Sequence, residues 1–173
     1  TKEVTDNLES YRFSDAANAV YQFVWGSFCD WYIEMIKPIL YGENEKDKSE
    51  TRSTFAWVLD RILVILHPFM PFITTELWNN TAQRSVKLIH APWPKDESID
   101  VEAMNDIDWA VELISNIRSL RAEMNIPAGA KPIVYLKDAN AESIKHIEQF
   151  NPIICTLARL EKLSAYDGDI TPD

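Results

Sequence analysis

The stretch VILHPFMPFITTELW, residues 64–78, sets two prolines inside what otherwise reads as one apolar helix. Pro68 cannot donate a backbone N–H and its ring crowds the preceding turn, whereas Pro71 suits the first turn of a helix that begins there. The sequence therefore predicts a helix that stops before Pro68, a break, and a new helix from Pro71 towards Trp78. Both prolines are assigned a structural role, because the break folds one apolar rod into two packed segments.

Long helices are predicted on both sides of this break. Residues 14–42 carry two apolar stripes, which predicts a helix covered on two sides. The mixed-charge run 43–50 reads as a polar loop, and apolar residues then repeat at helical spacing from Phe55 to Leu66. Residues 101–125 predict a further long helix. Its expected core face comprises Ala110, Leu113, Ile117, Leu120 and Met124.

The C-terminal part of the chain changes character. Residues 132–138, PIVYLKD, predict a strand, and residues 141–150 and 152–163 predict two helices. Residues 164–170, SAYDGDI, predict an extended end. So short a segment does not close a sheet alone, so the remaining strands are expected beyond Asp173.

These elements predict a mainly α-helical protein with two parts. A helical-bundle domain is expected over residues 1–130, and the start of a small, truncated α/β subdomain over residues 131–173. The first helix is also expected to be truncated, because residues 1–11 have helical spacing without a preceding cap.

Composition restricts the possible functions. The formal net charge of −10 disfavours DNA binding, which depends on neutralising phosphates, but leaves room for a few RNA bases held by aromatic side chains and a local basic patch. Apolar runs of about eighteen residues are absent, so no membrane partner is expected. Cys29 and Cys155 lie in apolar helical patterns, which favours free thiols and a cytoplasmic location.

The sequence predicts neither a catalytic nor a metal site. His67, His90 and His146 fall in three separate elements, and none is paired with a second ligand at metal-binding spacing. The four glycines stand alone, so a phosphate-binding loop is not expected either.

Two charged pairs remain. Asp30 and Glu34 share one helix face among aromatic residues, and Arg118 and Arg121 share a face of the last long helix. One interpretation is structural: the arginines pair with Asp30, Glu34 or Glu123 and tie helices together. The other is functional: guanidinium planes and exposed rings hold unstacked bases. Most of the six tryptophans are expected in the core, and one or two as stacking surfaces.

Four sequence blocks together resemble a known family. They are residues 11–40 (YRFSDAANAVYQFVWGSFCDWYIEMIKPIL), 66–78 (LHPFMPFITTELW), 91–94 (APWP) and 117–132 (IRSLRAEMNIPAGAKP). In this order and spacing they resemble the anticodon-binding region of class I aminoacyl-tRNA synthetases, and most closely that of the valyl-tRNA synthetases. The resemblance spans nearly the whole chain.

The resemblance implies a helical bundle that binds the anticodon stem-loop of tRNA(Val), followed by a small α/β subdomain. The fragment is then non-catalytic and without a cofactor. The parent enzyme implied by the family couples valine to tRNA(Val) with ATP and Mg²⁺, and edits mischarged tRNA. The catalytic signatures of the family are absent from this sequence, so the remaining synthetase domains become expected partners.

The residues expected to contact RNA are Arg118, Arg121, Phe28 and Trp31. Two alternatives stay open. The chain is a structural module that braces neighbouring domains, or it is the equivalent domain of an isoleucyl- or leucyl-tRNA synthetase.

Overall fold

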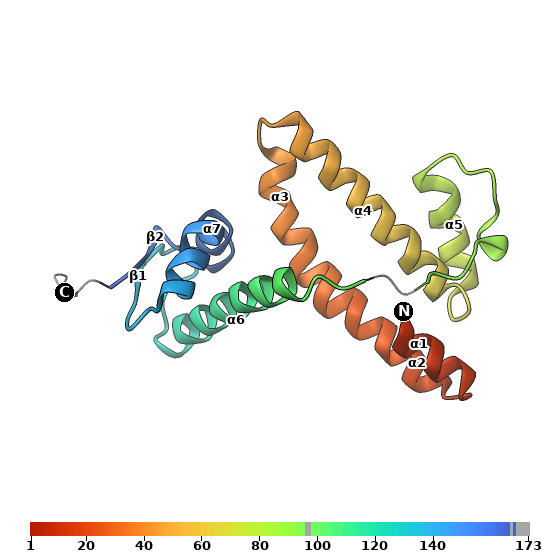
Figure 1. Cartoon of the computed structure of the whole chain (residues 1–173), viewed down its shortest axis with the longest axis horizontal. Coiled ribbons are helices and arrows are strands. Elements are labelled where there is room, and N and C mark those ends of the chain that lie inside the picture. The colour runs from red at the N-terminus through yellow and green to blue at the C-terminus, as the bar shows by residue number, and fades with distance from the viewer. Residues whose placement is uncertain (96–97, 167, 169–173) are drawn as a thin grey trace. The chain divides into compact units, whose positions relative to one another are not determined.

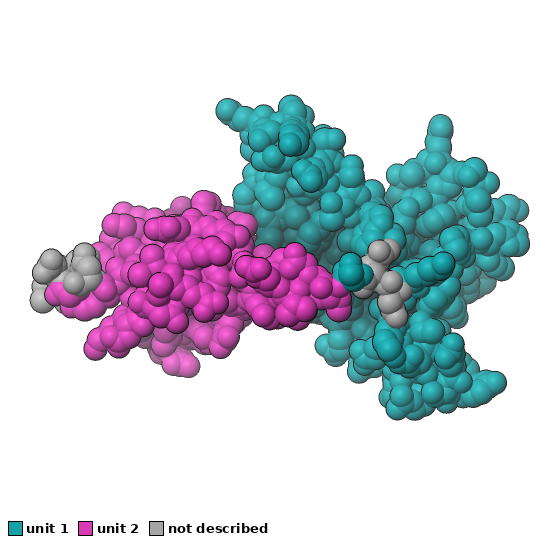
Figure 2. Space-filling model, in the orientation of Figure 1, with its two compact units in different colours: residues 1–98 teal, residues 99–173 magenta. Residues whose placement is uncertain are grey.

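The chain divides into two compact units. The computed structural model describes residues 1–95, 98–166 and 168 (Figure 1). Unit 1 comprises residues 1–98 and unit 2 residues 99–173, teal and magenta in Figure 2. The domain boundary expected at residue 130 stays a prediction, since a compact unit in space need not coincide with a domain in sequence.

Unit 1 begins with a short helix followed by one long rod. Helix α1 is Lys2–Glu9, and the rod comprises α2 (Phe13–Tyr21), the π-helical segment η1 (Gln22–Tyr32) and α3 (Ile33–Tyr41). The backbone stays in the right-handed helical region at the junctions Gln22 and Ile33, so the three segments are continuous. The long helix predicted for residues 14–42 is confirmed. It passes through Pro38 and ends at the extended Gly42.

Helix α4 is longer than the sequence indicated. It spans Glu45–Leu66, so the loop predicted for residues 43–50 is wrong from Glu45 onwards. The reason is a helix cap: the Asn44 side chain accepts hydrogen bonds from the backbone N–H groups of Lys46 and Asp47. Such a cap satisfies N–H groups that have no partner within the helix.

The break predicted at the two prolines is confirmed. Helix α4 ends at Leu66, and α5 (Pro71–Thr81) begins with Pro71 in its first turn. The backbone N–H groups of Phe69 and Met70 both donate to the Leu66 carbonyl across the break. Figure 1 shows α5 lying back beside the C-terminal end of α4.

A buried threonine fixes the geometry of this break. Thr74 is 1% exposed, and its hydroxyl donates to the Met70 carbonyl at 2.8 Å. Because a hydroxyl has one proton, its 2.9 Å contact with His67 Nδ1 makes it the acceptor there. The Thr74 side chain therefore ties His67, which follows α4, to the first turn of α5.

Replacing Thr74 by valine is expected to lower the free energy of unfolding by about 1 kcal/mol, because the half-buried His67 Nδ1 loses its partner, whereas the Met70 carbonyl still accepts from the backbone N–H of residue 74. Thermal or urea unfolding of the two proteins measures the difference. Thr75→Val is the matched control, since Thr75 is exposed and its hydroxyl bonds only the Pro71 carbonyl. Equal destabilisation by both changes would contradict this account.

Two apolar clusters stabilise unit 1. Val4, Ala16 and Val20 join α1 to α2, and Trp93 packs against them. Leu63, Trp78 and Leu88 join α4, α5 and the 3-10 turn η2 (Leu88–His90). The Trp93 indole N–H also donates to the Thr5 hydroxyl at 2.9 Å, which fastens residues 91–95 to α1.

Unit 2 is a helix followed by a β-α-β element. Its members are α6 (Val101–Glu123), β1 (Ile133–Leu136), α7 (Ala141–Ala158) and β2 (Lys162–Ala165). The strands are parallel, from the pair Ile133–Lys162 to the pair Leu136–Ala165. The strand predicted for residues 132–138 is confirmed.

Two predictions for the C-terminal part need correction. Residues 141–150 and 152–163 were predicted as separate helices, but α7 continues through Pro152 and ends at Ala158. The chain then turns at Arg159, whose φ of 55° is left-handed, and Lys162 and Leu163 begin strand β2 instead of ending a helix. Of the extended end predicted for residues 164–170, positions 167, 169 and 170 lie outside the described residues.

The buried face of α6 also differs from the prediction. The face that α7 covers within unit 2 carries Ala110, Ile114, Ile117 and Arg121. Leu120 and Met124, which were predicted as core, are exposed within this unit. The spacing of apolar residues is helical on both faces, so it did not distinguish the covered one.

Both cysteines are free, as predicted, and each is half-buried. Burial raises the pKa of the Cys155 thiol, against a smaller opposing effect of a backbone hydrogen bond with Leu163. Within the described residues, no helix has the length and apolar character needed to cross a membrane.

Candidate nucleic-acid interface

Arg121, one of the predicted RNA contacts, is engaged inside unit 2. Its side chain lies at the C-terminal end of α6 and the residue is 9% exposed. Its guanidinium donates to the backbone carbonyls of Arg159 at 2.9 Å, Pro127 at 3.2 Å and Ala130 at 2.9 Å. The sequence alternative expected carboxylate partners, whereas the partners observed here are carbonyls. This geometry favours a structural role for Arg121.

Arg118 joins the same region of unit 2. Its Nε and Nη2 atoms donate to the Leu157 carbonyl at 3.1 and 2.9 Å, although the residue is exposed. Arg159 in turn donates to the Ala128 carbonyl at 3.1 Å. The Arg118 bonds join α6 to the end of α7, and the bonds of Arg121 and Arg159 fix residues 127–130 beside it. RNA contact by Arg118 and Arg121 stays a prediction.

The two aromatic candidates lie on η1 in unit 1. Phe28 is 6% exposed and stacks on Tyr32 and on Phe55, with ring centroids 5.6 and 5.5 Å apart. Burial also raises the pKa of the Tyr32 hydroxyl. Phe28 is therefore part of a packed ring cluster, whereas Trp31 is half-buried. Their contact with RNA stays a prediction as well.

Asp30 and Glu34, the acidic pair on the same rod, are not among the partners observed for Arg121, which are backbone carbonyls. Glu34 forms an ion pair with Lys37, one turn further along the helix. Asp30 is exposed. The contact observed for Glu34 is thus a local surface pair, which contributes little to stability. The structural role expected for Asp30 and Glu34 stays a prediction.

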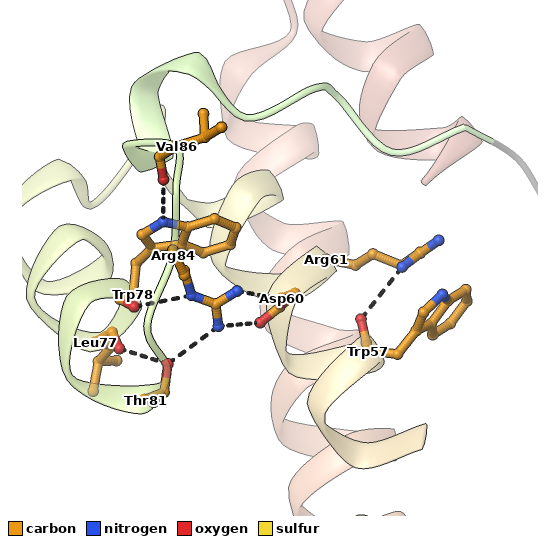
Figure 3. Close-up of polar contacts among 8 residues, drawn as sticks. All are labelled: Trp57, Asp60, Arg61, Leu77, Trp78, Thr81, Arg84 and Val86. Carbon is orange, nitrogen blue, oxygen red and sulfur yellow. Dashed lines mark hydrogen bonds and ion pairs between the residues drawn. The ribbon is translucent and has the colours of Figure 1, made fainter. Parts of the chain in front are cut away.

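A different set of arginines and tryptophans lies on α4 and α5 (Figure 3). Arg84 follows α5 and donates to both carboxylate oxygens of Asp60 on α4, each at 2.6 Å. Its guanidinium carbon lies 3.8 Å from the ring centroid of Trp78, and its Nε donates to the Trp78 carbonyl at 3.0 Å. The Trp78 indole N–H donates to the Val86 carbonyl. This clamp holds α5 and the following loop on α4.

A second arginine–tryptophan pair lies on α4, and its tryptophan is partly exposed. Arg61 lies over the ring of Trp57, one turn earlier on α4, with its guanidinium carbon 3.3 Å from the ring centroid. Its Nη1 also contacts the Trp57 carbonyl at 3.5 Å. Trp57 is 46% exposed. Sequence reasoning did not single out this pair, although an i,i+4 Trp–Arg spacing on a helix is a readable signal.

Arg61 also borders a groove of about 360 Å³ in unit 1. Its walls come from Val64 on α4, from Trp78 on α5, and from residues 91–95, which end in the exposed Lys95. The groove thus combines aromatic and apolar walls with two cations. Such surfaces hold unstacked bases of single-stranded nucleic acid.

A second groove of about 360 Å³ in unit 1 has only apolar walls. Tyr21 and Trp25 form one side, stacked with an interplanar angle of 4°, and Phe69 and Met70 at the helix break form the other. Three of these four side chains are exposed: Tyr21, Trp25 and Met70. A surface of this composition suits a protein contact.

Metal binding has no arrangement to support it in the part of the chain described. No three His, Cys, Asp or Glu side chains there are grouped to hold a metal ion. The buried His146 is instead bonded to Asp106 at 2.9 Å and packed on the ring of Trp109 in unit 2.

Residues 1–136 match the family model described as the anticodon-binding domain of tRNA ligase. The chain is 48% identical over 172 residues to the valine–tRNA ligase of Caulobacter vibrioides, covering 96% of this chain and 19% of that protein. It is 46% identical over 168 residues to the enzyme of that name from Brucella suis biovar 1, covering 95% and 18%. The chain therefore spans about a fifth of the length of these relatives.

Proposed function

Because the chain belongs to the anticodon-binding domain family of tRNA ligases, we propose that it recognises the anticodon stem-loop of tRNA(Val) as one domain of a valine–tRNA ligase. The observation that carries the proposal is the family match over residues 1–136, together with 46 to 48% identity to two valine–tRNA ligases. In this proposal the fragment binds and does not catalyse. The parent ligase couples valine to tRNA(Val) in the cytoplasm, using ATP and Mg²⁺ bound by its other domains.

Physical reasoning supports a separate recognition module. A pocket that selects valine discriminates weakly against isosteric amino acids, whereas a remote site can read the edges and faces of unpaired bases. The formal charge of −10 means that such a site must be a local cationic and aromatic patch. Unit 1 offers such a patch at Arg61 and Lys95.

The direct test is binding of the 173-residue chain to a fluorescently labelled tRNA(Val) anticodon stem-loop at low salt. We expect tighter binding of this loop than of a tRNA(Ile) loop or of a loop with an altered anticodon. Equal affinity for all three loops would contradict anticodon reading. A preference for the tRNA(Ile) loop would assign the chain to an isoleucine-specific ligase instead.

The apolar groove between Tyr21–Trp25 and Phe69–Met70 favours a second candidate function. In it, unit 1 braces a neighbouring domain of the same ligase, and RNA is bound elsewhere. The full-length ligase carrying Trp25→Ser would then lose thermal stability and keep its affinity for tRNA(Val). The anticodon-reading proposal instead requires that the isolated chain retain sequence-dependent RNA binding.

A further inference from the structure

We propose that one side of α2 and η1, together with the turn before α2, is the surface by which unit 1 docks on another domain of the same ligase. Four exposed aromatic residues define this surface, here called the aromatic band: Tyr11, Phe13, Tyr21 and Trp25. The inference rests on the proposed function in one respect, because it takes the chain as one domain of a valine–tRNA ligase. It gives the bracing role a surface and does not require that RNA be bound elsewhere.

The aromatic band is continuous along one side of the rod. Phe13, Ala17 and Tyr21 are each four residues apart on α2, so their side chains lie on one helix face. Tyr21 stacks on Trp25 of η1, with ring centroids 6.4 Å apart. Tyr11 meets Phe13 edge to face, with centroids 6.2 Å apart. Exposed apolar residues that are scattered singly are normal, whereas a contiguous group of this kind indicates an interaction surface.

The middle of the aromatic band opens into the apolar groove of about 360 Å³ described above. Ala17 lines the groove with a small side chain, which leaves room between the larger rings. Val24, Leu66 and Phe69 line it as well, and they also pack on the apolar cluster that joins α1 to α2. An apolar side chain inserted into the groove therefore extends the core of unit 1. Interfaces that stay closed are built in this way, like a domain core cut in half.

Tyr11 stands at a backbone position where glycine is usual. Its φ is 58°, and the N–H groups of residues 11 and 12 donate to the carbonyls of Leu8 and Asn7, which is the common left-handed ending of a helix. Asn125 also has a left-handed φ, but asparagine adopts this conformation readily and a bulky aromatic residue does not. Local strain is retained where the side chain has a use. Here that side chain is a ring that is 81% exposed.

The charges beside the turn favour a protein partner over RNA. The walls of the pocket between α1 and α2 include three carboxylates, from Glu3, Asp6 and Asp15, and two cations, from Lys2 and Arg12. Arg12 also lies 3.9 Å from the Asp15 carboxylate, which answers its charge. An excess of carboxylates repels phosphates. It suits a partner surface that has an apolar centre and a basic rim.

We assign the partner surface to the same polypeptide. In the two relatives compared above, about four-fifths of the protein lies outside the matched region. Domains joined in one chain meet at a high effective concentration, so a surface of modest size stays covered. A band of exposed aromatic rings that stays covered is also protected from aggregation.

The first experiment compares hydroxyl-radical labelling, read by mass spectrometry, between the full-length ligase without tRNA and the 173-residue chain. Tyr41 is the matched reporter for Tyr11, because the two are 84% and 81% exposed and Tyr41 lies at the opposite end of the rod. We expect Tyr11 to label about fivefold more slowly in the ligase, since the core of an interface excludes water. Tyr41 is expected to label within about twofold in the two proteins, as for an isolated surface residue. Equal labelling of both tyrosines in the ligase overturns the docking surface.

The second experiment uses Tyr11→Gly to separate the backbone from the ring. In the 173-residue chain this change is expected to raise Tm by about 2 °C, because glycine adopts the left-handed conformation without strain. In the ligase it is expected to raise the labelling of Trp25 about threefold, because a central contact is lost. Tyr41→Ser is the control and is expected to leave Trp25 labelling unchanged. A lower Tm for the Tyr11→Gly chain means that the ring stabilises unit 1 itself, which overturns its contact role.

The remaining outcomes identify other occupants. Tyr11 labelling that slows when tRNA(Val) is added to the chain assigns the aromatic band to RNA, and labelling that slows with rising chain concentration assigns it to a second copy. Either result overturns the proposal. If the chain binds no anticodon stem-loop while Tyr11 is protected in the ligase, anticodon recognition is overturned and the docking surface stands. The reverse pair of results overturns the docking surface and leaves anticodon recognition standing.

Discussion

Replacing Arg121 by alanine is expected to lower the free energy of unfolding of unit 2 by about 3 to 4 kcal/mol, the largest effect of any single polar side chain described above. The guanidinium donates hydrogen bonds to three backbone carbonyls, those of Pro127, Ala130 and Arg159. Hydrogen bonds from a charged donor are stronger than neutral ones, and the residue is 9% exposed, so water replaces them poorly. Their loss frees the segment between α6 and β1.

The measurement is urea unfolding of the whole chain, with amide hydrogen exchange to locate the effect in unit 2. Arg118→Ala is the matched control. It is one turn away and donates to the Leu157 carbonyl from an exposed position, where water replaces the lost bonds, so about 1 kcal/mol is expected. Arg121→Lys is expected to recover little, because an ammonium lacks the planar fork that reaches separate carbonyls. Arg121→Ala within about 0.5 kcal/mol of the wild type would refute this role.

Breaking the Arg84–Asp60 clamp is expected to destabilise unit 1 by about 2 to 3 kcal/mol. Arg84→Ala removes two charge-assisted hydrogen bonds, the bond to the Trp78 carbonyl and the stacking on the Trp78 ring. The side chains are 17% and 34% exposed, so part of the lost interaction is replaced by water. The value is therefore below that of a fully buried ion pair.

A double-mutant cycle with Asp60→Ala isolates the ion pair, and we expect a coupling energy of about 1 to 2 kcal/mol. Thermal unfolding at two salt concentrations gives the four stabilities. Arg12–Asp15 is the comparison pair, because it is exposed and 3.9 Å apart, and its cycle is expected to give almost no coupling. A coupling energy near zero in the Arg84–Asp60 cycle as well would mean that Arg84 stabilises unit 1 by packing alone.

The parts of the fold that could be predicted are those governed by neighbours in sequence. Pro68 and Pro71 act through their own rings and missing N–H groups, so the break between α4 and α5 could be read directly. The Asn44 cap was equally local and was missed, because the charged residues after it resemble a loop in composition. A capping residue ahead of them was the available signal.

The candidate site was predictable only in residue type. Arginine and aromatic side chains are the residue types that line the candidate groove of unit 1, but their positions depend on tertiary packing. Arg121 has carbonyl partners up to 38 residues away, and backbone acceptors leave no mark in the sequence. Phe28 and Trp57 both have helical spacing, yet Phe28 is 6% exposed and stacked on Phe55, whereas Trp57 is 46% exposed. Burial of this kind is decided by distant elements.

The bond between Trp93 and Thr5 has a consequence for the order in which the chain is completed on the ribosome. It joins α1 to a residue 88 positions later, so this bond of unit 1 can form once position 93 has left the exit tunnel. Arg121 must wait for the carbonyl of Arg159, 38 residues further on. Since domains fold as they emerge, N-terminal part first, the nascent chain closes the unit that carries the Trp57–Arg61 surface while the second unit is still being translated.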